Sequence, residues 1–210
     1  MPKEIAVRSN YHHGNLRQAV IDATLALVEE GGFENVNLRE VARRAGVSTG
    51  APFRHFPNKT ALLTAVAEEA MQFFRNEIVS EMKKLNNPDP LSCFRAIGIA
   101  YLNWAVRHPT HFQIISAQSQ IDFDGSESLR RDNEEVRALM EGVPPKIQFG
   151  GRALVFGLAR MYVSGHFTQW GLSKTSAKRA MTEMLDTFMN GLSVEMNESS
   201  APVAGPKSKK

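Results

Sequence analysis

The stretch that most constrains the fold is residues 32–63, GFENVNLREVARRAGVSTGAPFRHFPNKTALL. Its spacing predicts two short helices joined by a tight turn, followed by the start of a longer helix. Asn37 is predicted to cap the first short helix, with Glu40 three residues later completing a capping box. Gly46-Val47-Ser48 forms the turn, and Ser48 is suited to cap the second helix. This order predicts a DNA-binding helix-turn-helix.

The second short helix is predicted to carry the DNA contacts. Phe53 and Phe56 have the spacing of inward-facing residues, which leaves Thr49, Pro52 and Arg54 nearer the outside. Pro52 removes a backbone N–H from the first turn, so the start and tilt of this helix stay open. The run Pro57-Asn58-Lys59 is predicted to end it and to cap the next helix.

At these residues the sequence resembles the DNA-binding region of the TetR/AcrR family of bacterial regulators. The matching positions are Ala45-Gly46-Val47-Ser48, Gly50, Phe53, Phe56-Pro57, Lys59 and Leu62-Leu63. Pro52 departs from the pattern, since the family more often has Leu there. The resemblance implies an all-α fold with an N-terminal three-helix helix-turn-helix DNA-binding domain, followed by a larger helical effector-binding and dimerisation domain.

The predicted partner is double-stranded DNA. Arg54 is suited to pair with guanine, Thr49 to meet a base or a phosphate, and Pro52 to touch a thymine methyl group. The full predicted set of DNA contacts is Asn37, Arg39, Ser48, Thr49, Gly50, Ala51, Pro52, Phe53, Arg54, His55 and Lys59. Candidates for phosphate contacts are Arg8, Arg17, Arg39, Arg43, Arg44 and Lys59.

Composition bounds the class of protein without deciding it. The net charge of +3 is too small to indicate nucleic-acid binding. The lone Cys93 argues against a disulfide scaffold. The N-terminus lacks the apolar core of a signal peptide, and no apolar run reaches the ~20 residues that span a bilayer. We therefore expect a cytoplasmic protein with no membrane partner.

Helical periodicity and turn residues predict a string of helices. The expected helices are residues 13–30 or 15–30, then 58–85, 91–106, 110–118, 129–140, 147–170 and 175–194, with a loop at 121–128. The predicted domains are an N-terminal DNA-binding domain at 1–62, with its core at 14–60, a connecting helix at 63–85, an effector-binding and dimerisation domain at 86–196, and a disordered tail at 197–210.

The last two predicted helices carry an apolar stripe and several small residues. Such a stripe is equally typical of a core, but the family resemblance implies dimerisation through a four-helix bundle. The predicted interface consists of Gly157, Met161, Gly165, Met181, Met184, Leu185 and Phe188. A symmetric homodimer would place two helix-turn-helix units on a palindromic operator.

The middle of the chain is expected to hold an unknown small-molecule effector. Aromatic residues and Met line such sites, although they also build cores. The predicted pocket residues are Trp104, Phe112, Met140, Phe156, Met161, Tyr162, His166 and Trp170. His108-Pro109-x-x-Phe112 and Tyr162–His166 resemble the effector half of a TetR subgroup named for a Trp-His-Gly signature.

Other functions fit the sequence less well. Residues 46–50 fit G-x-S-x-G of hydrolases, but that chemistry needs a strand before the serine. His108 and His111, or Asp122 and Asp124, could in principle meet a cation, yet no further ligands accompany them. We predict no catalytic residue, metal or cofactor. The leading hypothesis is a homodimeric repressor released by its effector. The alternatives are a regulator or activator controlled by a protein partner and, more distantly, an α-helical enzyme.

Overall fold

Every regular element in the part of the chain described by the computed structural model, residues 16–199, is a helix. Side chains are described as far as residue 192. The expected all-α fold is therefore confirmed over this range. None of the described helices combines the length and the apolar character that a membrane span requires.

Residue contacts divide the chain into two units. Unit 1 comprises Met1–Met71 and Thr110–Arg130, and unit 2 comprises Gln72–Pro109 and Arg131–Lys210. Two helices, α3 (Lys59–Met82) and α6 (Glu127–Ala138), contribute residues to both units. This division differs from the predicted boundary at residues 86–90, because residues 110–130 belong with residues 1–71 and contact the first part of α3.

Unit 1 is built on α1 (Leu16–Gly31), α2 (Leu38–Arg44) and the first part of α3. The turns η1 (Phe33–Asn35) and η2 (Pro52–Arg54) connect them. The later residues of this unit form α5 (Pro109–Ser116) and η3 (Gln118–Gln120). Its core includes apolar side chains without measurable exposure, among them Val20, Ile21, Val41, Leu62, Leu63 and Val66.

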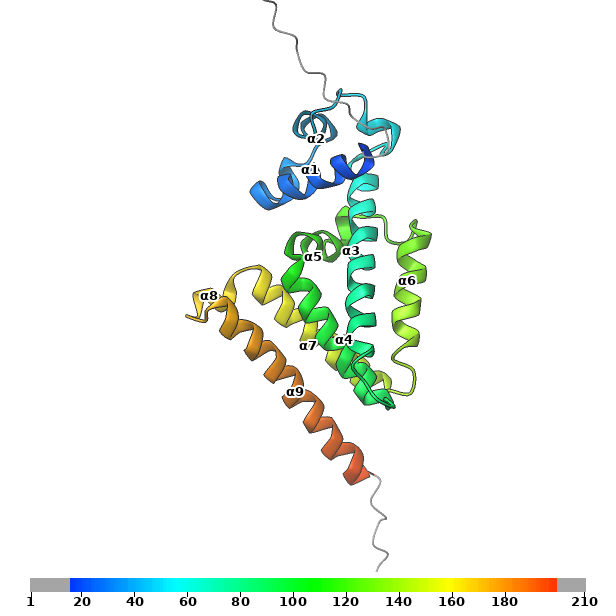
Figure 1. Ribbon diagram of the computed structural model, residues 1–210, viewed down its shortest axis with the longest axis vertical. Helices are drawn as coiled ribbons and strands as arrows, with labels where there is room; N and C mark the ends of the chain where they lie inside the picture. Colours follow the sequence, from blue (N-terminus) through cyan, green and yellow to red (C-terminus); the bar gives the residue numbers. More distant parts are fainter. Residues whose placement is uncertain (1–15, 200–210) are drawn as a thin grey trace, which may run out of the picture. The chain divides into compact units, whose positions relative to one another are not determined.

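Unit 2 is a packed set of three long helices, α4 (Pro90–Arg107), α7 (Pro145–Val163) and α9 (Lys174–Ser199), which lie side by side in Figure 1. Small residues allow the helices to approach closely. A Cβ atom on Gly98 would lie 2.8 Å from Leu185, and one on Gly151 would lie 2.5 Å from the Phe94 ring. Larger residues at these two positions would push the helices apart.

The end of the chain differs from the sequence prediction in two places. The single helix expected at 147–170 is interrupted, because Gly165 adopts a left-handed conformation with φ of 79°. It separates α7 from the short helix α8 (His166–Gln169). The final helix continues to Ser199, so it extends into the segment predicted to be a disordered tail.

Candidate DNA-binding site

The start of α2 is fixed by Asn37, as the sequence predicts. Its backbone is extended, and its Oδ1 accepts a hydrogen bond from the Glu40 amide at 2.9 Å. The predicted return contact from the Glu40 side chain is wrong. That carboxylate instead accepts a hydrogen bond from Nε of Arg43 at 2.8 Å, and Arg43 holds the pKa of Glu40 below its usual value. The cap is therefore single rather than reciprocal.

The turn between α2 and the next segment depends on Gly46. Its φ of 68° lies in the left-handed region that favours glycine. The Val47 amide then donates to the carbonyl oxygen of Ala42 at 3.0 Å, which closes the end of α2. The predicted turn is confirmed.

The segment after the turn is not the α-helix that the sequence predicts. Only Pro52–Arg54 is helical, as one 3-10 turn with Ala51 rather than Ser48 in the cap position. The Ala51 amide donates to the Ser48 carbonyl at 2.9 Å, and the Arg54 amide donates to the Ala51 carbonyl at 3.2 Å. Pro52 has no N–H to continue an α-helical ladder, which accounts for the short turn.

The side chains of this segment face differently from the prediction. Pro52 and Ala51 are buried, so the expected contact of Pro52 with a thymine methyl group is wrong. Phe53, predicted to pack inward, has 51% of its surface exposed, whereas Phe56 is buried. Because the proline ring occupies the inward position, the phenyl ring of Phe53 turns outward.

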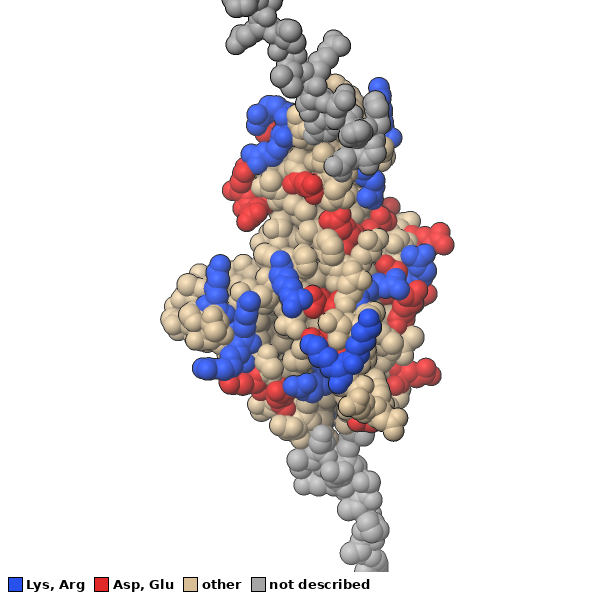
Figure 2. Space-filling model, viewed as in Figure 1, with Lys and Arg blue, Asp and Glu red and all other residues tan. Residues whose placement is uncertain are grey.

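The outward-facing residues of this segment form one contiguous candidate surface, which we call the reading segment. Its members are Ser48, Thr49, Gly50, Phe53, Arg54 and His55, all exposed. Asn37 and Arg39, at the start of α2, are exposed as well. Figure 2 shows basic side chains around α2 and the turn after it, while acidic side chains lie over α1.

Two of the predicted phosphate contacts are arginines of α2 with acidic partners. Arg43 pairs with Glu40, as described above. Arg44 reaches α1, where its Nη2 donates to Oε2 of Glu30 at 2.6 Å. This hydrogen bond lowers the pKa of the Glu30 carboxyl group. Their charges are therefore partly neutralised within unit 1.

Lys59 and Arg17 also have internal partners. Nζ of Lys59 donates to the carbonyl oxygen of Phe33 at 2.6 Å. The Arg17 guanidinium lies 5.8 Å from the centre of the Phe56 ring and 3.9 Å from a Glu68 oxygen. Among the described basic residues of the helix-turn-helix, Arg39 and Arg54 carry no ion pair. Arg8 lies outside the described residues.

The predicted effector residues are spread over both units. Phe112 is buried in unit 1, and the others belong to unit 2. Trp104 is buried among Phe74 and Tyr101, with ring centres 5.4–5.5 Å apart, and burial raises the pKa of Tyr101. Met140 is buried, Met161 and Tyr162 are half-buried, and Phe156, His166 and Trp170 are exposed.

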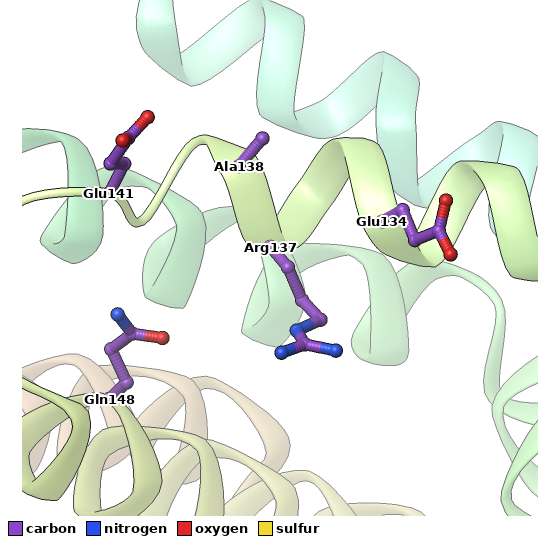
Figure 3. Close-up of a pocket in the computed structure, with 5 residues that line it drawn as sticks. All are labelled: Glu134, Arg137, Ala138, Glu141 and Gln148. Atoms are coloured by element: carbon purple, nitrogen blue, oxygen red, sulfur yellow. The ribbon is translucent and has the colours of Figure 1, made fainter.

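A hollow of about 330 Å³ opens between the end of α6 and the start of α7. None of the predicted effector residues lines it. Four of its five lining residues have polar side chains, and the five are Glu134, Arg137, Ala138, Glu141 and Gln148. Figure 3 shows Arg137 and Gln148 pointing into the space between the two helices. The Gln148 amide also donates to the carbonyl oxygens of Met140 at 3.1 Å and Val143 at 2.8 Å, which fixes the α6–α7 turn.

The predicted dimer interface needs correction at two positions. Met181 and Leu185 are each 1% exposed, because they form the inward side of α9 within their own unit. Met184 lies on the exposed side, Phe188, Gly157, Met161 and Gly165 are half-buried, and a Cβ atom on Gly157 would meet no neighbour within 4 Å. The predicted interface also lacks Phe149, which is 79% exposed on α7.

Both histidines and Asp122, three of the candidate cation ligands, have other partners. The His108 ring stacks on Phe73, and Nε2 of His111 lies 3.0 Å from Oε1 of Glu69. Asp122 accepts a hydrogen bond from the Gly125 amide at 2.9 Å within its own loop.

Two family descriptions match the chain. Residues 20–66 match "Bacterial regulatory proteins, tetR family", and residues 94–188 match "Tetracyclin repressor-like, C-terminal domain". Among curated relatives, the transcriptional repressor KstR of Mycolicibacterium smegmatis is 31% identical over 143 residues, covering 63% of this chain and 67% of the relative. The transcriptional regulator BetI of Serratia proteamaculans is 36% identical over 81 residues, covering 39% of this chain and 41% of the relative.

Solved structures support the fold. A protein of unknown function from Rhodococcus sp. RHA1 has a TM-score of 0.65 at 23% identity, covering 88% of this chain and 98% of its own. The TetR-like regulator LfrR of Mycobacterium smegmatis, solved with proflavine, has a TM-score of 0.57 at 16% identity, covering 83% of this chain and 96% of its own.

Proposed function

Because this chain belongs to the TetR family of bacterial transcriptional regulators, which are not enzymes, we propose that it is a cytoplasmic homodimeric repressor. It binds a palindromic operator and releases it when a small molecule binds. The observation that carries the proposal is the exposed reading segment, which the capped helix α2 and the Gly46 turn present on one short loop.

In the proposed complex the reading segment enters the major groove. Arg54, with its exposed guanidinium, pairs with a guanine, and Thr49 meets a base or a phosphate. Phe53 lies against the DNA by apolar contact. Arg39 supplies a phosphate contact, and the N-terminus of α2 after Asn37 favours negative charge. Lys59 supports this surface from inside the domain, because its ammonium group donates a hydrogen bond to the carbonyl oxygen of Phe33.

The proposed homodimer forms through the exposed sides of α7 and α9. Phe149, Phe156 and Met184 leave 79%, 45% and 48% of their surface exposed. A Cβ atom on Gly157 would meet no neighbour within 4 Å, so this position offers a recess between these larger side chains. Covering such a surface with a second copy removes apolar area from water and pairs two reading segments.

The proposed effector is a small organic molecule that binds within unit 2. LfrR was solved with proflavine, and a TetR variant from Acinetobacter baumannii with minocycline. In this chain the buried Trp104 and Met140 and the half-buried Met161 and Tyr162 are the predicted residues that such a ligand would contact. The ligand releases DNA only if it binds the DNA-free arrangement more tightly.

The test is selection of random duplex DNA by the full-length protein at two salt concentrations. We expect one palindromic sequence to be enriched. Arg54→Ala should lose that enrichment while keeping most of the non-specific binding. Arg43→Ala is the matched control, because Arg43 is paired with Glu40. The selected duplex then serves to screen small molecules for release.

Three results would contradict parts of this proposal. Absence of any enriched sequence argues against sequence-specific binding. Equal losses of specific and non-specific binding in Arg54→Ala would place Arg54 on a phosphate rather than a base. Enrichment of a single half-site would argue against the dimer.

A further inference from the structure

Glu69 lies at the junction of three helices of unit 1. Its Oε2 accepts a hydrogen bond from Nε2 of Gln18, on α1, at 3.1 Å. Its Oε1 lies 3.0 Å from Nε2 of His111, on α5. Figure 1 shows α5 beside α3, the helix that carries Glu69. One carboxylate therefore joins a helix of the helix-turn-helix to a helix that follows α4 in the sequence.

These two contacts are sheltered from water. The side chains of His111 and Glu69 are 10% and 17% exposed. Hydrogen bonds to a carboxylate are stronger than those between neutral groups, and a less polar surrounding strengthens them further. Removing one donor leaves a carboxylate oxygen with less solvation than it would have in water.

Neighbouring positions on α3 join the same segments. Oε1 of Glu68 accepts from the Ser126 hydroxyl at 2.8 Å, while its other oxygen lies 3.9 Å from the Arg17 guanidinium. Oγ1 of Thr64 accepts from the Asp122 amide at 2.9 Å. The polar side of α3 thus holds α1 and residues 110–130 together over consecutive turns.

We propose that Glu69 is a positioning residue that couples α5 to α1. A change at His111 reaches α1 through the two oxygens of this carboxylate. Because α1 packs against α2 and η2, its position sets that of the reading segment. The consequence for DNA rests on the proposed function, since residues 110–130 then become a route by which an event outside the helix-turn-helix alters operator binding.

The coupling is tested by hydrogen exchange of the full-length chain without DNA. His111→Leu keeps an apolar side chain in place of the ring and removes the hydrogen bond. We expect exchange of α1 amides to become roughly 10- to 150-fold faster, the range given by a hydrogen bond to a charged group of about 1.5–3 kcal/mol. Gln113→Leu, on the same helix, is the control and should leave α1 unchanged.

A second background separates coupling from a general loosening of unit 1. In Glu69→Ala, which already lacks the carboxylate, adding His111→Leu should produce no further acceleration in α1. Glu69→Leu, which also has no acceptor oxygen, replaces it if the alanine variant does not fold. An equal effect of His111→Leu in both backgrounds, or no effect on α1 in the wild type, would overturn the proposal.

Affinity for the selected duplex gives the functional readout. We expect His111→Leu to weaken it about 2- to 10-fold, again only when Glu69 is present. If the wild type shows no preference for any DNA sequence, the proposed function is contradicted. The exchange measurement still decides whether Glu69 couples α5 to α1. Altered exchange without altered affinity would confine the coupling to the fold and overturn its role in DNA binding.

Discussion

Lys59, the first residue of α3, donates from Nζ to the carbonyl oxygen of Phe33, in the turn that follows α1, at 2.6 Å. This bond joins two ends of the helix-turn-helix that are 26 residues apart in the sequence. The ammonium group therefore holds the domain together from within rather than projecting toward solvent.

The first prediction contrasts Lys59 with Arg39. We expect Lys59→Met to lower the free energy of unfolding by about 1 kcal/mol, because a charge-assisted hydrogen bond is lost. The salt dependence of DNA binding should stay unchanged. Arg39→Ala should do the reverse, with unchanged stability and a salt slope that falls by about 1. Urea unfolding and DNA titration at several salt concentrations measure both. A reduced slope in Lys59→Met would restore it as a phosphate contact.

The second prediction concerns pH and the Glu30–Arg44 pair. Arg44 holds the pKa of Glu30 below its ordinary value of 4.5. A lowered folded-state pKa stabilises the folded chain above the unfolded pKa, and this stabilisation is lost as the pH falls through the folded value. We therefore expect Glu30→Gln to melt below the wild type at pH 7, and the difference to shrink as the pH falls below 4.5.

Thermal unfolding at pH 7 and at about pH 3 measures this difference. Glu29→Gln is the matched control, because Glu29 is exposed and adjacent in the sequence. A difference in melting temperature that is the same at both pH values would show that charge on Glu30 does not carry the effect.

The third prediction tests the proposed dimer. Phe149→Asp combined with Phe156→Asp should give a monomer in sedimentation, because two carboxylates would be desolvated in the interface. The palindrome preference should weaken with it. Leu139→Asp is the control, since Leu139 is 45% exposed and lies outside α7 and α9. Dissociation in the control, or a dimer that persists in the double variant, would place the interface elsewhere.

The fourth prediction concerns the attachment of α6 to α3 in unit 2. Nη1 of Arg75 lies 2.5 Å from Oδ1 of Asp132, whose side chain is 2% exposed. Arg75→Leu should lower the free energy of unfolding by about 1–3 kcal/mol, because it leaves a buried carboxylate with a weaker partner. Arg131 is exposed, and its Nη2 lies 3.4 Å from Oδ1 of Asp132. Arg131→Leu should therefore lower the free energy of unfolding by less than Arg75→Leu. Replacing both Arg75 and Asp132 by Leu should recover much of the loss, and urea unfolding of the three variants decides this.

Local signals in the sequence were enough to predict most helices. Asn37 and Asn58 cap the helices that they were expected to cap, the latter by accepting from the Ala61 amide at 2.8 Å. The turn residues 86–90 separate α3 from α4 as expected. These features depend on neighbours within a few residues, which the sequence displays directly.

Contacts between distant residues could not be predicted in the same way. Arg44 and Lys59 belong to a motif that suggests DNA contact, and only the fold brings them to Glu30 and Phe33. The periodicity of α9 marked Met181 and Leu185 as apolar, but it does not tell which apolar residues a neighbouring helix already covers. Only the folded structure shows that Phe149 lies on the surface.

Around the Pro52 turn, the residues that fix the backbone differ from those that face solvent. Ala51, Pro52 and Phe56 are buried and fix the path of the backbone. Their neighbours Thr49, Phe53, Arg54 and His55 are exposed. Variants that differ only at these four side chains should fold like the parent. The same fold can therefore be given side chains that bind other DNA sequences.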